Sequence, residues 1–539
     1  MKKSLIIFGA CAAIGIAMHA YSDKDIQSAK LHYAQQAISQ LYVDSIDDNK
    51  LVEDAIVGML KGLDPHSSYT NAEETRELNE PLEGNFSGIG VTFNLNQDTV
   101  YVIQTVAGGP SEKVGIMGGD RIIACNDTVL AGVKMKRSEI MKHLRGPKGT
   151  KANLKVLRRS GGKADTINFV VTRAEIPIYS IDAAYMVNDS TGYIRINKFA
   201  AETAKEFREA LAKLQAKGLK HLILDLEENG GGYLNASVEL LSELLPYHSL
   251  AVYTKGYASE RYNHFTNPDG PRPMFDEGRL VVLVNQYSAS ASEITSGAIQ
   301  DYDRGVIVGR RTFGKGLVQR PIPFPDGSMM RLTVAHYYTP SGRDIQKPYE
   351  KGKGEEYEQD ILDRLNSGEL MHADSIHYDP NLKLNTLKRG RVIYGGGGIS
   401  PDVFVPLDTT EYSGYYRDLV AKGVINSYTI DYVDKNRKAL KKMYKTDDDF
   451  INGFEITETM WSDLRALGEK EKVEFKEEEF QRSKSLLETI IKALIGRDIY
   501  EDYTYYKIYN RHDPIFLKAL EVITGPDYDT YLQSPPAES

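Results

Sequence analysis

Near its middle the chain reads Leu222-Ile223-Leu224-Asp225-Leu226-Glu227-Glu228-Asn229-Gly230-Gly231-Gly232. The run 222–226 is almost wholly apolar, which is typical of a strand buried on both faces of a parallel sheet. A glycine-rich turn follows directly, and a helix is predicted near 234–244. A strand that passes through a tight turn into a helix is the repeating unit of an α/β layer fold.

The alternation of strands and helices extends on both sides of this stretch, from residue 192 to residue 345. Apolar runs predict the strands, and apolar residues at spacings of three and four predict the helices. The predicted elements there are strands at 193–196, 222–226, 280–284 and 306–308, helices at 202–217, 234–244 and 288–299, and a hairpin of 317–324 with 329–338. A helix at 355–366 and a strand at 403–405 are predicted beyond this region.

The flanking parts of the chain differ in character. The pattern of 24–62 is helical, and the segment from 408 onward is helical, acidic and rich in tyrosine. Dense glycines and short β-rich runs at 81–176 predict a compact, mostly β module with one helix at 138–144. The predicted domains are a signal peptide at 1–20, a helical segment at 21–80, the β module at 81–176, an α/β core at 177–407 and a helical extension at 408–539.

Length and composition limit the kind of protein. A chain of 539 residues corresponds to about three or four domains. The net charge of -9 argues against nucleic acid as the main partner, because a phosphate-binding surface needs excess Lys and Arg. No run of about 18 apolar residues lies beyond the first twenty, which excludes a polytopic membrane protein.

The first twenty residues have the pattern of an export signal. Met1-Lys2-Lys3 is a basic start, and Leu5 to Met18 is an apolar run that ends near Ala20. The cleavage site is imperfect, so the segment is either removed or retained as an anchor. The chain is therefore expected to be exported, to the periplasm or the cell envelope.

Cysteines and histidines give no sign of a disulfide or a metal site. Cys11 lies in the signal, which leaves Cys125 as a lone cysteine and predicts a small core residue. His372 and His377 are the closest histidine pair, but they lie in a charged segment without cysteines nearby. No metal and no cofactor is expected.

Two glycine- or serine-rich turns follow buried strands. The first, 225–232, offers free backbone N–H groups for an anion, or is simply a tight turn. The second reads Ser288-Ala289-Ser290-Ala291-Ser292-Glu293 at a helix start. Ser290 with Glu293 fits a capping box, yet a hydroxyl at a helix N-terminus is also well placed for nucleophilic catalysis.

A third feature, Gly309 to Gly316, nearly matches a phosphate-binding loop. Gly316 replaces the Ser or Thr that would hold Mg²⁺, and a strand follows instead of a helix, so a nucleotide site is not expected. On that strand Lys315, Leu317 and Gln319 would share one face. A desolvated lysine becomes a neutral amine and a competent base, whereas the ordinary alternative is a solvated surface lysine.

Taken together, these motifs resemble the carboxy-terminal processing (tail-specific) serine peptidases, over about residues 30–406. The order of the motifs and the 25-residue gap from Ser290 to Lys315 carry the resemblance. It implies an α/β peptidase core with crotonase-like or ClpP-like layers, an inserted PDZ domain and helical extensions at both ends. The motifs are Gly58-Met59-Leu60, Leu63-Asp64-Pro65-His66-Ser67, the turn at 225–232, the serine cluster at 288–293, Thr312 to Gly316 with Gln319, and Thr339-Pro340-Ser341-Gly342-Arg343.

The resemblance also assigns catalytic roles. It makes Ser290 the nucleophile, Lys315 the general base and Gln319 the group that orients the lysine. The oxyanion donors would be the backbone amide of Ala291 and that of Gly231 or Gly232. The family usually carries an arginine where this chain has Glu227, so the local charge of the turn differs.

The β module indicates which partners the chain is expected to bind. Phe86-Ser87-Gly88-Ile89-Gly90-Val91 resembles the carboxylate-binding loop of a PDZ domain, and a substrate tail would add there as a β-strand. The expected partners are protein or peptide substrates with free C-termini. The alternative is a PDZ fold that serves as a spacer or an internal lid.

Two other functions are alternatives to that of an exported peptidase that cleaves proteins near their C-termini. The main alternative is a non-catalytic tail-binding or scaffold protein on the same fold, which the presence of both Ser290 and Lys315 disfavours. An α/β-hydrolase esterase is disfavoured because no GxSxG motif occurs. The extension at 408–539 is expected to pack on the core, or on a second subunit to give a homo-oligomer.

Overall fold

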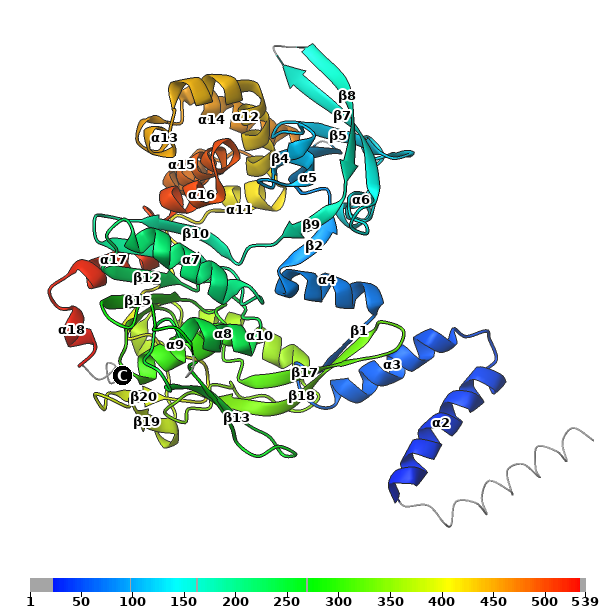
Figure 1. Ribbon diagram of the computed structural model, residues 1–539, viewed down its shortest axis with the longest axis vertical. Helices are drawn as coiled ribbons and strands as arrows, with labels where there is room; N and C mark the ends of the chain where they lie inside the picture. Colours follow the sequence, from blue (N-terminus) through cyan, green and yellow to red (C-terminus); the bar gives the residue numbers. More distant parts are fainter. Residues whose placement is uncertain (1–22, 97, 161–162, 268–269, 534–539) are drawn as a thin grey trace, which may run out of the picture. The chain divides into compact units, whose positions relative to one another are not determined.

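The computed structural model describes residues 23–533 apart from 97, 161–162 and 268–269 (Figure 1). The predicted signal at 1–20 lies outside the described residues. The chain divides into two compact units. Unit 1 comprises the described residues up to Thr75 with Gln319–Thr333 and Tyr349–Tyr357, and unit 2 comprises the rest. Within the described part of the chain, no helix is long and apolar enough to span a membrane.

The centre of unit 2 is a six-stranded sheet. Its first two strands pair antiparallel, and every other neighbouring pair is parallel. In spatial order the strands are β10 (Ile181–Met186), β11 (Thr191–Ile196), β12 (His221–Asp225), β15 (Arg279–Val284), β16 (Val306–Gly309) and β21 (Val403–Phe404).

Helices cover both faces of this sheet, which is why its central strands are mostly apolar. Leu222 and Leu224 of β12 belong to the core formed with three helices on one face. Ile223 points to the opposite face and packs in a core with a helix from the far end of the chain. The helices are α7 (Thr203–Gln215), α8 (Leu234–Leu241) and α9 (Ala291–Asp301) on the first face and α17 (Pro514–Thr524) on the second.

Smaller elements complete the α/β core. β13 pairs with β14 and with the end of β18 in unit 2. β17 and β18 form a hairpin. Its middle part, Gln319–Thr333, belongs to unit 1, and the residues on either side belong to unit 2. These elements are β13 (Leu250–Lys255), β14 (Tyr262–Phe265), β17 (Leu317–Pro323), β18 (Met329–Tyr338), α10 (Gly354–Asn366), the 3-10 turns Ala373–Ser375 and Pro380–Leu382, β19 (Lys383–Asn385) and β20 (Val392–Tyr394).

The β module is a separate sheet with its own apolar core. Its strands run in the order β3-β4-β5-β7-β8, with β6 paired to β5, so β3 is an edge strand. Cys125 lies fully buried in this core, as predicted. The elements are β2 (Asn85–Gly88), β3 (Val91–Asn96), β4 (Thr99–Thr105), α5 (Pro110–Lys113), β5 (Arg121–Cys125), β6 (Thr128–Val129), α6 (Arg137–Leu144), β7 (Lys151–Ser160), β8 (Lys163–Thr172) and β9 (Ala174–Pro177).

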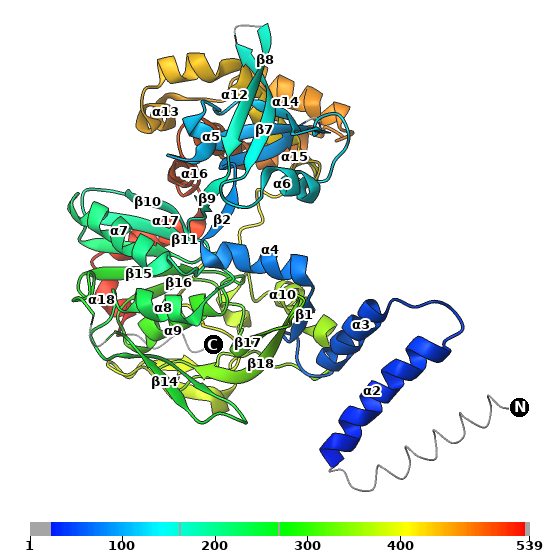
Figure 2. The same cartoon turned by 45° about the vertical axis from the view of Figure 1, so that its right-hand side comes forward.

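The segment after β21 forms a helical domain and then returns to the six-stranded sheet. Phe480, Leu487 and Ile491 lie in the core of this domain. The domain helices are α11 (Gly414–Ala421), α12 (Val424–Met443), α13 (Asp447–Gly453), α14 (Glu458–Lys470), α15 (Glu477–Ile499) and α16 (Asp502–Tyr509), after which α17 and α18 (Tyr528–Tyr531) follow. Figure 2 shows α12, α14 and α15 grouped together and α17 beside β11.

Unit 1 holds the N-terminal helices and β1, together with the parts of β17 and β18 that lie within Gln319–Thr333. The N-terminal elements are α2 (Asp23–Leu41), α3 (Asp48–Lys61) and β1 (Ser68–Thr70), and α4 (Ala72–Glu83) leads from unit 1 into unit 2. β1 pairs antiparallel with the unit 1 part of β18. The Asp64 carboxylate accepts hydrogen bonds from the Ser67 and Thr333 hydroxyls, at 2.5 and 2.8 Å.

The structure confirms the predicted fold class of an α/β core with a mostly β PDZ module and helical ends. Two details differ. The strand predicted to carry Lys315 begins at Leu317, so the argument that Lys315 and Gln319 share one strand face does not hold. The extension at 408–539 packs on the six-stranded sheet through α17, as expected for one of its two alternatives, but the helices before α17 form a domain of their own.

Candidate active site

Ser290 occupies the N-cap position of α9, where strand β15 has led through residues 285–290 into the helix. Its backbone has φ 56° and ψ −113°, a conformation that a non-glycine residue adopts only when its surroundings enforce it. The side chain is half-buried, so solvent reaches it. A strained turn at a helix start is an arrangement that presents a side chain to a substrate.

The neighbouring serines are used for structure. Ser288 and Ser292 are both fully buried. The Ser288 hydroxyl donates to the Leu226 carbonyl at 2.7 Å, and the Ser292 hydroxyl donates to the Asn229 carbonyl at 2.8 Å. Of the three serines in the cluster, only Ser290 is open to solvent.

The same hydrogen bonds lock the serine turn against the glycine-rich turn after β12. The Ala289 N–H also donates to the Asn229 carbonyl, at 3.0 Å. A Cβ atom on Gly231 would lie 2.7 Å from Ser290 Cβ, so only glycine allows this approach. The two turns predicted to form a site therefore lie in direct contact.

The backbone N–H groups near Ser290 are not equally available to an oxyanion. The Gly231 N–H donates to the Asn229 side-chain oxygen at 2.9 Å. Those of Gly232 and Ala291 are hydrogen-bonded to no other described residue. Of the two glycines named as candidate donors, Gly232 has the N–H group that is not already used.

Glu293 connects the turn that carries Ser290 to the loop that carries Lys315. Its fully buried carboxylate accepts from the backbone N–H groups of Ser290, Gly314 and Lys315 at 2.7–2.8 Å. It also accepts from the Thr312 hydroxyl at 2.5 Å. Burial raises the pKa of this carboxyl, while the hydrogen bonds oppose that rise. The sequence indicates only the helix-capping role of Glu293, because its partners in the loop lie about twenty residues further along the chain.

Lys315 and Gln319 fall in different units. Lys315 is a half-buried residue of unit 2, just before β17, and its carbonyl accepts a hydrogen bond from the Tyr337 hydroxyl. Gln319 belongs to unit 1, where its amide donates to the Thr333 hydroxyl at 3.3 Å. The predicted role of Gln319 toward Lys315 stays a prediction.

Glu227 lies in a buried charged network after β12. The side chain is 7% exposed, and burial together with Asp513 and Asp225 raises the pKa of its carboxyl well above the ordinary range. The Arg195 guanidinium donates to the Glu227 carbonyl oxygen at 3.0 Å and also pairs with Asp225. The turn is thus built around a carboxyl group where related chains are expected to carry a cation.

The predicted carboxylate-binding loop lies between β2 and β3 of the β module. Phe86, Ser87 and Gly88 belong to β2, and Val91 begins β3. The Ile89 and Gly90 carbonyls accept hydrogen bonds from Ser111 and Val106, respectively. Their buried N–H groups are hydrogen-bonded to no other described residue, which is the condition for binding an anion.

Among the described residues, no group of three or more His, Cys, Asp or Glu side chains could hold a metal ion.

Models of four known families match parts of the chain. Residues 190–354 match the model of peptidase family S41, and residues 87–171 match that of a PDZ domain. Residues 14–75 match the activating protease CtpB N-terminal domain, and residues 415–501 match a family of unknown function (DUF8443). The carboxy-terminal processing protease CtpB of Bacillus subtilis is 30% identical over 81% of this chain and 90% of its own length. A carboxy-terminal-processing protease of Bartonella bacilliformis is 35% identical over 57% of this chain and 69% of its own. The solved photosystem II D1 C-terminal processing protease is 28% identical over 58% of this chain and 83% of its own, with a TM-score of 0.32.

These matches define the class: the chain is a serine-type peptidase with a PDZ domain. It belongs to the carboxy-terminal processing proteases of peptidase family S41.

Proposed function

We propose that this peptidase cleaves protein substrates near their C-termini, with Ser290 as nucleophile, Lys315 as general base and Gln319 as the residue that orients the lysine. The observation that carries the proposal is the difference among the three serines. Ser290 is solvent-accessible in a strained turn at a helix start, while Ser288 and Ser292 are buried with their hydroxyls already bonded.

The proposed reaction has two halves. Ser290 Oγ attacks the peptide carbonyl carbon while the neutral Lys315 amine takes the hydroxyl proton. The N–H groups of Ala291 and Gly232 stabilise the oxyanion, and the lysine returns the proton to the leaving amine. Water then hydrolyses the acyl-enzyme, with Lys315 again as base. Glu293 supports both halves, because it bonds the backbones of Ser290 and Lys315.

The PDZ domain is proposed to select the substrate tail. Two observations support this: the unpaired N–H groups of Ile89 and Gly90, and the edge position of β3, to which a tail can add as a further strand. Tail binding would hold a substrate by its free carboxylate while an upstream bond is cut.

The test compares the chain with Ser290→Ala and Lys315→Ala on an unfolded protein substrate. Each variant is expected to lose activity by about 100-fold or more, since the step that needs the missing group is removed. Activity of the unchanged enzyme should rise toward alkaline pH, because the base must be a neutral amine. Lys205→Ala, on an exposed lysine of the same unit, is the matched control and should keep full activity.

The competing function is a tail-binding protein without hydrolysis. That hypothesis predicts that all four proteins leave the substrate intact, whereas equal cleavage by all four would show that the assigned residues are wrong.

We also propose export, from the basic start and apolar run of residues 1–20. Fractionation of cells that express the full chain, beside a form lacking residues 2–20, tests it. The full chain should leave the cytoplasm and the shortened form should stay inside. Retention of both forms in the cytoplasm would contradict export.

A further inference from the structure

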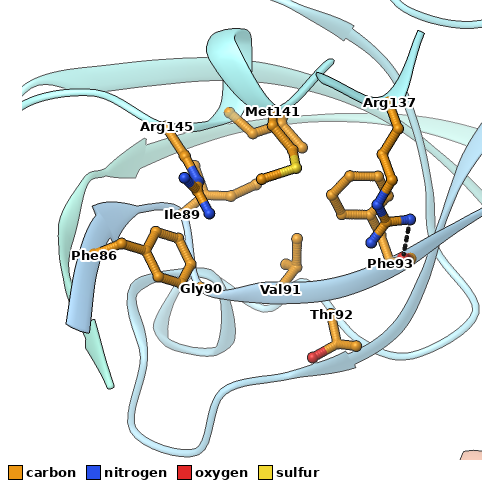
Figure 3. A pocket seen from close by; sticks show the side chains of 10 residues that line it. Phe86, Ile89, Gly90, Val91, Thr92, Phe93, Arg137, Met141 and Arg145 are labelled. Atoms are coloured by element: carbon orange, nitrogen blue, oxygen red, sulfur yellow. Dashed lines mark hydrogen bonds between the residues drawn. The ribbon is translucent and has the colours of Figure 1, made fainter. Parts of the chain in front are cut away.

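The PDZ domain contains a groove between β3 and α6 (Figure 3). It has a volume of about 230 Å³, and its floor and walls are mostly apolar. Two arginines stand at opposite ends of the groove, Arg145 beside Phe86 and Arg137 beside Phe93. The apolar lining residues are Ile89, Val91, Phe93, Met141 and Leu144.

The two arginines differ in their partners. Arg145 forms an ion pair with Glu80, and its guanidinium lies 4.6 Å from the centre of the Phe86 ring. Arg145 therefore already has a carboxylate partner, although Glu80 also pairs with the more exposed Arg76 at 3.7 Å. The Arg137 guanidinium lies 4.5 Å from the centre of the Phe93 ring and donates to the Phe93 carbonyl at 3.2 Å. Among the described residues no carboxylate pairs with Arg137, so one end of the groove keeps an unbalanced positive charge.

Strand geometry shows which part of a bound tail would meet this charge. A tail whose carboxylate lies at Ile89 and Gly90 runs antiparallel to β3. Figure 3 shows Val91 and Phe93 pointing toward α6 and Thr92 pointing away. Val91 and Phe93 are two residues apart, about 6.6 Å along a strand, which is also the spacing from the last residue of a tail to the one two positions before it. The last side chain thus meets the apolar wall, and the side chain two positions earlier meets Phe93 and Arg137.

We propose that Arg137 is a specificity residue, which favours substrate tails with an apolar last residue and Asp or Glu two positions before it. The inference rests on the proposed tail binding and adds the chemical class of tail. An acidic side chain at that position would form the ion pair that Arg137 lacks among the described residues, whereas a lysine there would be repelled.

The experiment measures peptide binding to the full chain carrying Ser290→Ala, which prevents cleavage. Three fluorescent peptides end in Glu-Ala-Val, Gln-Ala-Val and Lys-Ala-Val, and a fourth repeats the first with an amidated C-terminus. Fluorescence anisotropy at low salt should rank them Glu, Gln, Lys, with about a five-fold range in Kd from first to last, as for a solvent-accessible charge pair. The range should shrink as salt is raised.

Variants separate Arg137 from the general charge of the domain. Arg137→Gln should abolish the ranking, and Arg137→Glu should reverse it. Lys136→Gln removes the adjacent exposed cation, which does not line the groove, and should leave the ranking unchanged. Thermal melting of each variant checks that the fold is intact.

The outcomes distinguish the two proposals. Binding that needs the free carboxylate but ignores the residue two positions earlier overturns the role of Arg137 and leaves tail selection standing. Equal effects of the Lys136 and Arg137 changes also overturn it. Failure of every peptide to bind, or equal binding of the amidated peptide, overturns tail selection and this inference with it.

Discussion

At the scale of single residues, Gly231 determines how closely the two turns of the site approach. Its φ of 100° suits glycine, and an added Cβ would lie 2.7 Å from Ser290 Cβ and 2.8 Å from the Ala289 carbonyl oxygen. Gly231→Ala is therefore expected to displace Ser290, the proposed nucleophile, and to lower kcat by about 100-fold or more, as a small misplacement of reacting groups does. Gly230→Ala is the matched control, because that position is open, and it should keep most activity. Equal activity of both variants would contradict the close approach.

Glu227 gives a pH-dependent prediction at the same scale. Burial, Asp513 and Asp225 raise the pKa of its carboxyl well above the ordinary 4.5. The folded chain thus binds this proton more tightly than the unfolded chain, and the free energy of unfolding falls as pH rises above 4.5. Glu227→Gln mimics the protonated form, so its thermal midpoint should exceed that of the unchanged chain at pH 8 and approach it at pH 4.5. Glu228→Gln, on the exposed neighbour, should show no such difference, and a Glu227→Gln variant that is less stable than the unchanged chain at pH 8 would refute the argument.

At the scale of elements, β5 of the PDZ domain meets α12 of the helical domain. Arg121 and Asp434 form two hydrogen bonds, of 2.7 and 3.3 Å, and their side chains are only 10% and 13% exposed. Tyr101, Ile103 and Ile430 form an apolar cluster at the same contact. Asp434→Arg leaves two partly buried cations facing each other and is expected to open the contact, with faster amide hydrogen exchange in β4 and α12.

The reversed pair supplies the control for that contact. Arg121→Asp combined with Asp434→Arg restores opposite charges and should return the exchange rates toward those of the unchanged chain, with a coupling energy of about 1–2 kcal/mol. Additive effects of the two changes would show that the charges do not act on each other.

At the scale of the whole molecule, helix α17 near the C-terminus covers one face of the sheet that is formed by the middle of the chain. Ile515 and Phe516 of α17 pack in one core with Ile223 and Val281 of the peptidase sheet. Phe516→Ala should lower the free energy of unfolding by about 3 kcal/mol through the cavity that it leaves. Leu517→Ala, on the 45% exposed neighbour, should cost far less. Similar denaturant midpoints for the two variants would contradict a structural role for α17 on the sheet.

The sequence predicted those features that depend on local patterns. The apolar run at 222–226 predicted a strand buried on both faces, and the capping-box pattern of Ser290 with Glu293 indicated a helix start, although the helix was predicted from 288 and begins at Ala291. Contacts between segments that are distant in the sequence could not be predicted from such patterns. The amphipathic pattern of 514–524, for example, does not indicate which surface the helix covers. The position of Lys315 in a loop depends on the Glu293 carboxylate, which fixes the loop from a distant helix.

The central claim is that Ser290 is a nucleophile activated by Lys315. The most direct measurement is mass-spectrometric location of the adduct formed by a fluorophosphonate probe. A single adduct on Ser290 is expected, absent from Ser290→Ala and formed about 100-fold more slowly in Lys315→Ala. An adduct on another serine, or an unchanged rate in the Lys315 variant, would contradict the assignment.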